Sequence, residues 1–479
     1  MSLLITVMLS AAPAKTAAPA PLSRADARKK QAAAASVETH RGELVSLSDQ
    51  VWGFAETALK ETRSAALLAD YAAKQGFKVE RGTSGMPTAF VASYGEGAPV
   101  IAVLGEYDAL PGLSQKAQPE RAPLVAGAPG HGCGHNLFGV ASLGAATAIK
   151  ELIAAGRLKG TVRFYGTPAE ESVGGKAYMA RDGVFKDVDV ALAWHPADRN
   201  RADMQGGQAI VDMMVEFHGK AAHAAADPWN GRSAVDAVEL FTHAVNMMRE
   251  HVKPTVRMHY VITAGGDVPN VVPELGRVWI WAREFNRAEL DSIIERLRAA
   301  VQGAALATGT QGSLRIQAGD LEILINETGE RLLDANLRLF GPIRYTPEEE
   351  AFAKALQTNA GVEPRGLETA VVPLENQVQE GGSTDVGDVS WVVPTLHVSV
   401  VTAPRGVPWH SWSVVAASGM SIGHKGLVLA AQTLAATMVD LFDDPAARAA
   451  VKAEFAKKTK GYTYKPYIPD GPPPLPKAE

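Results

Sequence analysis

The chain has 479 residues, of which 46% are hydrophobic and 21% are charged, and its formal net charge at pH 7 is −5. These proportions are typical of globular proteins and exclude bulk disorder and a coiled coil. The negative charge gives no general attraction to nucleic acid or to an anionic membrane, so we expect neither as a partner. No apolar run approaches the ~20 residues that a membrane-spanning helix needs. Cys133 has no second cysteine with which to form an intrachain disulfide.

The N-terminal residues 1–36 differ in composition from the body of the chain. A short apolar stretch from Leu3 to Leu9 precedes the small residues Ala12-Pro13-Ala14, and an Ala/Pro/Lys-rich stretch continues to Ser36. This pattern predicts a signal peptide and a linker, and therefore a periplasmic or secreted protein. The alternative is a disordered leader on a cytoplasmic protein.

The first half of the body alternates between helical and strand patterns. Helical spacing of apolar residues occurs at 45–55, 61–75 and 138–155, and strand patterns occur at 77–80, 89–94, 100–104, 162–165 and 188–194. Strands that alternate with helices predict a mainly parallel sheet that is covered on both faces. In such sheets, ligands bind at the carboxyl ends of the strands.

The pattern changes in the middle of the chain. Strand patterns at 208–217, 257–264, 277–285 and 313–317 and helical patterns at 232–250 and 288–306 follow the ferredoxin-like order β-α-β-β-α-β. Helices at 332–339, 351–358 and 425–441 and a strand at 395–401 then resume the α/β pattern. We therefore predict a three-layer α/β domain (37–205 and 321–449), interrupted by an inserted α+β domain (206–320). Residues 450–479 are predicted to form a C-terminal tail. Its proline-rich stretch Tyr462–Glu479 is predicted to join no core and to run extended over the surface.

The most informative stretch is Gly130-His-Gly-Cys-Gly-His-Asn136, which comes just before a predicted helix. Cys133 and His135 are two positions apart, and in an extended backbone such residues face the same way. A thiolate and an imidazole could then converge on one metal ion. The alternative is a glycine-rich turn with an unreactive thiol.

Three other segments place metal-binding residue types near the same edge of the sheet. Glu170 and Glu171 follow one predicted strand, His195 ends another, and His410 comes from the returning second half of the domain. Because neighbouring carboxylates point to opposite sides, one could bind metal while the other acts as a general base toward a water. With the Cys-x-His pair, these donors suit two zinc-class ions, which would activate a water and polarise a substrate carbonyl.

The motifs resemble those of the metal-dependent amidohydrolases and exopeptidases, which include the hippurate, auxin-conjugate and p-aminobenzoyl-glutamate hydrolases. The resemblance spans about residues 44–441 and is strongest to the group of aminobenzoyl-glutamate hydrolase B subunits. The segments that carry it are Gly130–Asn136, Pro168-Ala-Glu-Glu171, Trp194-His195, Gly219-Lys-Ala-Ala-His223, Pro269-Asn-Val-Val-Pro273 and Gly382-Ser-Thr-Asp385.

The resemblance implies a role for each matching residue. It implies two divalent ions per chain, zinc or manganese, with the ligands Cys133, His135, Glu171, His195 and His410. It further implies that Glu170 is the general base, that the inserted domain mediates dimerisation, and that His223 and Asn270 reach the substrate in the partner subunit. Trp412 stands where many relatives have proline after His-Ser, which makes His424 a rival to His410 as the last ligand.

We therefore expect a homodimeric, dinuclear amidohydrolase that cleaves the amide bond of N-acyl or N-aroyl amino acids. Asp108 and Asp385 are expected close to the site, and Arg232 and Arg283 are candidates for holding a substrate carboxylate. One alternative is a dipeptidase or carboxypeptidase that uses the same metal centre on short peptides. Another is a non-catalytic binding subunit, and a hetero-oligomer with a related subunit also stays open.

Overall fold

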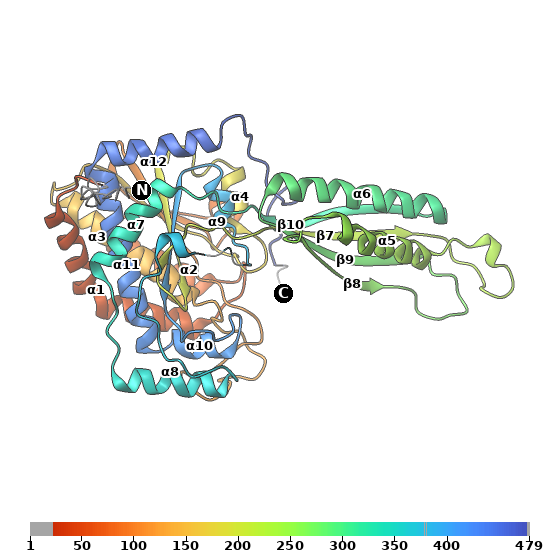
Figure 1. The fold of residues 1–479 in the computed structure, drawn as a ribbon, viewed down its shortest axis with the longest axis horizontal. Coiled ribbons are helices and arrows are strands. Elements are labelled where there is room, and N and C mark those ends of the chain that lie inside the picture. The colour runs from red at the N-terminus through yellow and green to blue at the C-terminus, as the bar shows by residue number, and fades with distance from the viewer. Residues whose placement is uncertain (1–22, 378, 380, 477–479) are drawn as a thin grey trace, which may run out of the picture.

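The computed structural model describes residues 23–476 except 378 and 380, so the predicted signal peptide lies outside the described residues. A rounded larger domain carries a seven-stranded sheet, and an elongated inserted domain with a four-stranded sheet extends from one side of it (Figure 1). The predicted α/β fold class is confirmed.

The sheet of the larger domain is mixed, with parallel strands only at its centre. Its strand order is β1-β2-β4-β3-β5-β11-β6, and the β4–β3, β3–β5 and β5–β11 pairs are parallel, whereas the pairs toward both edges are antiparallel. The prediction of a mainly parallel sheet is therefore wrong for the strand pairs toward the two edges. The strands are β1 Lys78–Arg81, β2 Phe90–Glu96, β3 Val100–Gly105, β4 Gly160–Gly166, β5 Val190–Ala197, β6 Arg201–Ala202 and β11 Thr395–Val401.

The helices of the larger domain include one that the sequence pattern assigned to a linker. The Asp26 side chain caps helix α1 by accepting a hydrogen bond from the Arg28 N–H, and Ala33 and Val37 are buried. The prediction of a linker is therefore wrong from Ala27 onward, where helix α1 begins. The helices are α1 Ala27–Phe54, α2 Thr62–Lys74, α3 His135–Ala154, α4 Gly175–Arg181, α7 Glu327–Phe340, α8 Pro347–Asn359, α9 Val386–Ser390, α10 Trp412–Ser418, α11 Ser421–Asp443 and α12 Pro445–Lys458.

Two of these helices, α3 and α11, are long and apolar enough to cross a membrane by length and composition alone. The expectation that no apolar run approaches the length of a membrane-spanning helix is therefore wrong. However, 78% of the apolar window in α3 and 89% of that in α11 are buried inside the protein. Both pack against each other and against α1, and they contribute to the main hydrophobic core.

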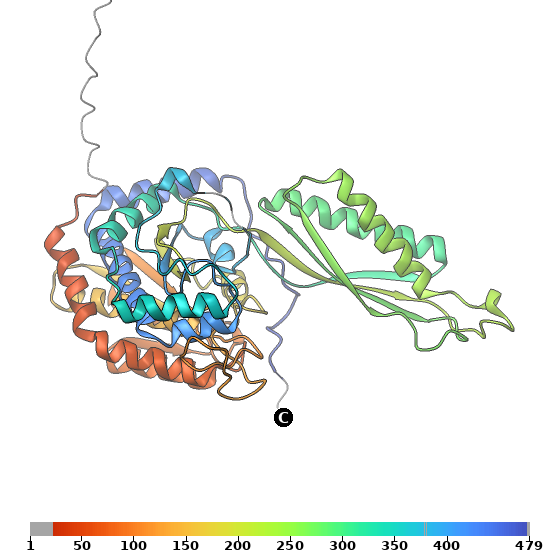
Figure 2. The ribbon, with the colours of Figure 1, turned by 60° about the horizontal axis from the view of Figure 1, so that its bottom comes forward.

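The inserted domain has the strand order β10-β7-β9-β8, which is that of a ferredoxin-like unit. Helices α5 and α6 cover one face of the sheet (Figure 2), and every second residue along β7 and β9 is buried beneath them. The elements are β7 Ala209–His218, α5 Ala234–Met248, β8 Arg257–Ala264, β9 Leu275–Glu284, α6 Arg287–Thr308 and β10 Gln311–Asp320. Short 3-10 segments lie at Thr83–Gly85, Pro228–Asn230, Arg249–His251 and Leu374–Asn376.

The segment after α12 runs along the junction between the two domains (Figure 1). Tyr467 is buried in the core of the inserted domain, and its hydroxyl donates to Asp291 at 2.6 Å. The Tyr464 hydroxyl donates to Asp388 of the larger domain at 2.7 Å. The prediction that this tail joins no core is therefore wrong, because the rings of Tyr464 and Tyr467 pack against the hydrophobic cores.

Candidate active site

A cleft of about 830 Å³ lies between the two domains. From the larger domain, Cys133, Glu170, His195 and His410 line it. These side chains come from the loop before α3, the loop after β4, the end of β5 and the loop before α10, so the carboxyl ends of neighbouring strands converge here as expected. The inserted domain supplies the opposite wall.

The Cys133 and His135 side chains converge, although not for the predicted reason. Helix α3 already begins at His135, and Gly134 before it has a φ of +75°, so the backbone turns instead of being extended. A Cβ atom at Gly134 would also lie 2.9 Å from the Pro196 side chain. Glycine is thus needed here both for its conformation and for the close approach of the chain to β5.

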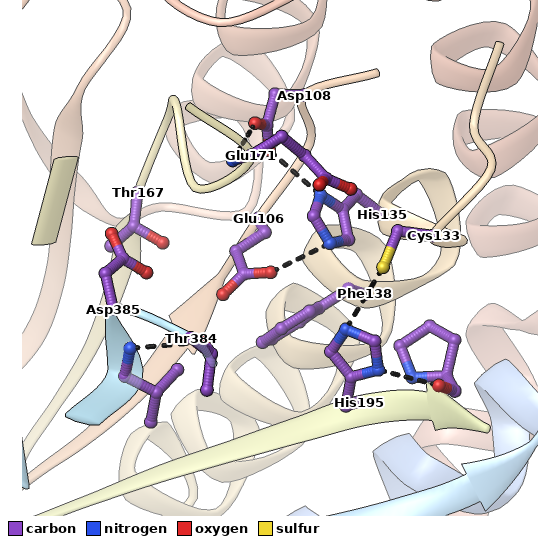
Figure 3. A network of polar contacts seen from close by, with 12 residues as sticks. Glu106, Asp108, Cys133, His135, Phe138, Thr167, Glu171, His195, Thr384 and Asp385 are labelled. Atoms are coloured by element: carbon purple, nitrogen blue, oxygen red, sulfur yellow. Dashed lines mark hydrogen bonds and ion pairs between the residues drawn. The ribbon is translucent and has the colours of Figure 1, made fainter. Parts of the chain in front are cut away.

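The ring of His135 is fixed between two buried carboxylates. Its Nδ1 lies 2.9 Å from Asp108 Oδ1, and its Nε2 lies 3.1 Å from Glu106 Oε2 (Figure 3). Asp108 also accepts the backbone N–H of Glu171 at 2.9 Å. The contact with Asp108 orients the ring in the way that carboxylates orient metal-binding histidines.

The ring of His195 is oriented in a similar way. Its Nδ1 lies 2.7 Å from the Pro196 carbonyl, which can only accept, so Nδ1 carries the proton. Its Nε2 is therefore an acceptor, and it lies 3.4 Å from Cys133 Sγ, which can donate to it as a thiol. A histidine nitrogen beside a thiol is a pair of donors that suits a borderline metal ion such as zinc.

Glu170 and Glu171 follow a strained turn. Ala169 has a φ of +65°, and its N–H is accepted by the buried Glu61 at 2.9 Å. Among the described residues, the buried Oε1 atom of Glu171 has no hydrogen-bond partner. Strain of this kind persists only where the surroundings impose it, and it is common at functional sites.

The side chain of His410 reaches the same site, whereas that of His424 does not. His410 Nε2 lies 3.5 Å from Glu171 Oε2, and the His410 backbone N–H donates to the Gly132 carbonyl at 3.1 Å. His424 lies on α11, where its Nε2 contacts Asp49 at 2.9 Å. Of the two candidates for the last metal ligand, only His410 lies in the cleft of the described structure.

Among the residues that the structure describes, donor atoms gather in three groups that could each hold a metal ion, with all atoms of a group within 4.8 Å of one another. The groups are Cys133–His135–His195, Cys133–Glu171–His410 and Glu106–His135–Glu170. A metal ion would give the unpartnered Glu171 oxygen a partner and would take the place of the Cys133 thiol proton beside His195 Nε2. The residues therefore fit a metal centre.

The acidic groups of the site are crowded in a buried space. Burial raises the pKa of Glu171 to about 7, against the nearby charge of His135. Burial and the Glu106 and Glu171 carboxylates raise the pKa of Glu170 well above its ordinary value. Burial and the same kind of repulsion from Glu171 raise the pKa of the Cys133 thiol. Bound cations would reverse these effects, because they stabilise the deprotonated forms.

A buried lysine that the sequence did not single out lies behind the site. Lys176 Nζ lies 2.6 Å from Glu106 Oε1 and 2.6 Å from Asp385 Oδ1. Asp385, which was expected close to the site, anchors this lysine. Neither Glu106 nor Lys176 stands in a recognisable spacing pattern, so the sequence offered no signal for this network beyond their proximity to the motifs.

His223 and Asn270, which were predicted to contact substrate, lie outside the cleft of their own chain. Both are exposed residues of neighbouring loops of the inserted domain, where His223 bridges to Val271 and the Ala224 N–H donates to the Asn270 carbonyl at 3.0 Å. Arg283 lines the cleft, whereas Arg232 is not among the described residues that line it.

Comparison with known proteins agrees with this site. Residues 102–358 match the model of peptidase family M20/M25/M40. The chain is 38% identical to the B-type subunit of p-aminobenzoyl-glutamate hydrolase from Escherichia coli (92% of this chain, 98% of the relative) and 31% identical to a mouse Xaa-Arg dipeptidase (90% and 92%). A solved dinuclear metal-binding M20 peptidase of Bacillus subtilis shares the fold, with a TM-score of 0.60 at 19% identity over 85% of this chain and 99% of that chain.

The family resemblance inferred from the motifs is thus confirmed. The match covers the strands and loops that carry the converging thiol, imidazole and carboxylate groups, and the related proteins are named as hydrolases and peptidases. The chain therefore belongs to peptidase family M20/M25/M40, and it is a metal-dependent amidohydrolase or peptidase.

Proposed function

We propose that this protein hydrolyses the amide bond of N-acyl or N-aroyl amino acids at a dinuclear metal centre. The observation that carries the proposal is the convergence of Cys133, His135, Glu171, His195 and His410 in one cleft, with Glu170 beside them. Similarity to a p-aminobenzoyl-glutamate hydrolase over 92% of the chain supports this substrate class.

The proposed ligands are those five residues, and the ions are zinc or manganese. Bound divalent ions supply Lewis acidity, which polarises a carbonyl and lowers the pKa of a water. In this scheme Asp108 orients the ring of His135 and the Pro196 carbonyl orients the ring of His195. Glu170 lines the cleft next to the ligand Glu171, where it can take a proton from a water and pass it to the leaving amine.

The first test is metal content. Elemental mass spectrometry on the purified protein should find about two zinc or manganese ions per chain, and fewer in Cys133→Ala. Lys116→Ala provides a control, because this exposed side chain lies outside the cleft lining. The absence of metal from all three proteins after reconstitution would contradict the proposal and favour the alternative of a non-catalytic binding protein.

The second test separates the roles of the two glutamates. Glu170→Gln should abolish turnover while metal content is kept, because this residue is proposed to move a proton and not to bind metal. Glu171→Gln should lose metal. The opposite result would show that the two roles are exchanged.

The proposal includes a homodimer that forms through the inserted domain. Strand β8 is an edge strand with exposed Val261 and Ile262, and the adjacent helix α5 exposes Leu240 and Met247. Unpaired strand edges and exposed apolar side chains favour association with another chain. In such a dimer His223 and Asn270 are proposed to contact substrate in the partner's cleft.

Complementation tests this sharing of the site. Purified Glu170→Gln and His223→Ala proteins should each have little or no activity, and mixed dimers should recover activity because one cleft then has both residues intact. Size-exclusion chromatography with light scattering checks the dimer in each case. Verified mixed dimers without recovered activity would contradict a shared site.

A dipeptidase is the second candidate, which the 31% identity to an Xaa-Arg dipeptidase favours. A panel of N-acyl amino acids and Xaa-Arg dipeptides, assayed with the metal-loaded enzyme, discriminates the two. Higher kcat/KM for dipeptides would replace the proposed substrate class but keep the metal centre. A requirement for a second, related protein would appear as activity that the purified chain alone lacks.

A further inference from the structure

The turn between β4 and α4 carries both glutamates of the site, and its backbone is held at several points. Ala169 in this turn lies in the left-handed region, with a φ of +65°. Its carbonyl accepts the backbone N–H groups of Val173 and Gly174 at 3.1 and 3.0 Å. Its own N–H donates to Glu61 Oε1 at 2.9 Å. Both polar groups of this one residue are therefore engaged.

The left-handed conformation of Ala169 is unfavourable by itself. The Cβ atom of an L-residue then lies too close to the following carbonyl oxygen, a clash that glycine lacks. Alanine keeps this conformation only where its surroundings impose it. The conformation matters to the site, because a change of φ at Ala169 would redirect the chain that follows, and Glu170 is the next residue.

Glu61 comes from a distant part of the chain. It occupies the N-cap position of α2 and is fully buried, but its side chain makes no capping hydrogen bond to that helix. The side chain of Glu56 contacts the first turn of α2 instead, where it accepts the Ser64 N–H at 2.9 Å. Burying a carboxyl group is unfavourable unless it is hydrogen-bonded, and the Ala169 N–H supplies such a bond to Glu61.

Asp108 holds the backbone on the other side of Glu170. Its Oδ2 accepts the Glu171 N–H at 2.9 Å, and its Oδ1 lies 2.9 Å from His135 Nδ1 (Figure 3). The backbone N–H groups before and after Glu170 are thus each held by a buried carboxyl group. The proposed ligand Glu171 has its own anchor in Asp108, whereas the direction of Glu170 depends on the residue before it.

We propose that Glu61 is a positioning residue for Glu170: by accepting the Ala169 N–H, it holds the left-handed turn that directs the Glu170 carboxyl group into the cleft. Glu61 is not among the described residues that line the cleft, so it acts through the turn. The inference rests on the proposed function, in which Glu170 moves a proton. Proton transfer needs the base within hydrogen-bond reach of the water, and a misplacement of about 1 Å can cost about 100-fold in rate.

Steady-state kinetics of the metal-loaded protein with p-aminobenzoyl-glutamate test this role. Glu61→Leu removes the acceptor and should lower kcat about 10- to 100-fold, with KM within about threefold of wild type. Its metal content should equal that of wild type, because Asp108 anchors Glu171 independently. An unchanged kcat would overturn the inference.

Glu61→Gln is the conservative variant. Burial and the Asp108 charge raise the pKa of Glu61 to about 8, so the neutral acid predominates at pH 7 and glutamine has nearly the same shape and charge. Its side-chain oxygen can still accept the Ala169 N–H, so kcat should stay within about threefold of wild type. An equal fall of kcat in Glu61→Gln and Glu61→Leu would overturn the inference, because only the second variant lacks the acceptor.

Ala169→Gly separates positioning from a merely structural role. Glycine adopts a positive φ without strain, so the turn then depends less on Glu61. The fall in kcat that Glu61→Leu causes should therefore be at least about threefold smaller in the Ala169→Gly background than in wild type. If Glu61 only stabilised the fold, the fall would be the same in both backgrounds, and the inference would be overturned.

Glu56→Leu is the matched control. Glu56 also accepts backbone N–H groups, those of Arg63 and Ser64, and it is not among the described residues that line the cleft. The variant should lower the free energy of unfolding in urea but leave kcat of the folded, metal-loaded protein unchanged. A fall in kcat as large as that of Glu61→Leu would overturn the inference.

Crystal structures of wild type and Glu61→Leu give a readout that needs no activity. In the variant, Ala169 should leave the left-handed region and the Glu170 carboxyl group should move from its wild-type position. An unchanged φ at Ala169 would overturn the inference, and so would loss of metal, because Glu61 would then hold the ligand Glu171. If metal-loaded wild type cleaves no N-acyl amino acid, the proposed function fails, while these two structures still decide whether Glu61 holds the turn.

Discussion

Replacing Lys176 by methionine should strongly destabilise the larger domain. The side chains of Lys176, Glu106 and Asp385 are all 0% exposed, and the lysine ammonium group contacts both carboxylates at 2.6 Å. Methionine fills much of the same space but leaves Asp385 without a counter-charge and leaves Glu106 with only the His135 ring, at 3.1 Å, beside it. The Asp385 carboxylate would keep only its hydrogen bond from the Lys176 backbone N–H at 2.8 Å.

The burial of these three side chains determines how much unfolding free energy the substitution should cost. Removing one partner of a buried ion pair costs about 3–5 kcal/mol, because an uncompensated charge remains in the interior. The pair between Lys74 and Glu43 provides the contrast, since its side chains are 72% and 37% exposed. Lys74→Met should therefore cost less than about 1 kcal/mol.

Urea unfolding of the metal-free proteins measures both values, because a metal that binds only the folded state would mask the difference. Neutralising both carboxylates in Lys176→Met, with Glu106→Gln and Asp385→Asn, should recover most of the lost stability. If Lys176→Met lost no more stability than Lys74→Met, the reasoning about an uncompensated buried charge would be refuted.

Three further predictions follow from the tail, from a buried carboxyl group and from the last metal ligand. Tyr467→Ala should lower the free energy of unfolding by about 3 kcal/mol in urea titrations, because it empties a site in the core of the inserted domain, and a near-zero change would contradict this packing. Burial raises the pKa of Asp388 from 3.8 to about 7, so its stabilising contribution is complete below about pH 4 and is lost as the pH rises to 7. Between pH 5 and 7, the free energy of unfolding measured in urea should therefore fall less for Asp388→Asn than for wild type. An equal fall in both proteins would argue against the raised pKa of Asp388. Elemental analysis should find less metal in His410→Ala and unchanged metal in His424→Ala, and the reverse would restore His424 as the ligand.

The sequence predicted most regular elements because their apolar periodicity is local. The strand at 395–401 and the strand at 257–264 appear with the predicted bounds. Errors occurred where local composition and tertiary packing disagree. Residues 27–36 are rich in small residues, which suggested a linker, yet alanines pack closely in helix α1 against α3 and α11.

For the active site, the sequence named the side chains but not how they meet. Spacing suggested that Cys133 and His135 converge, but a left-handed glycine at the start of α3 achieves this and not an extended backbone. The choice between His410 and His424 could not be made locally, because both follow the same strand in the chain. The fold decides it, since one lies in a loop over the cleft and the other on a packed helix.

The sequence by itself determined the α/β class, the inserted ferredoxin-like unit and the chemical types of the site residues, since periodicity and short motifs are properties of neighbouring positions. Only the tertiary structure decided the antiparallel edges of the sheet, the buried Lys176 network and the position of Arg283 in the lining of the cleft. Each of these depends on contacts between segments far apart in the chain, and such contacts are set by packing and charge compensation in three dimensions.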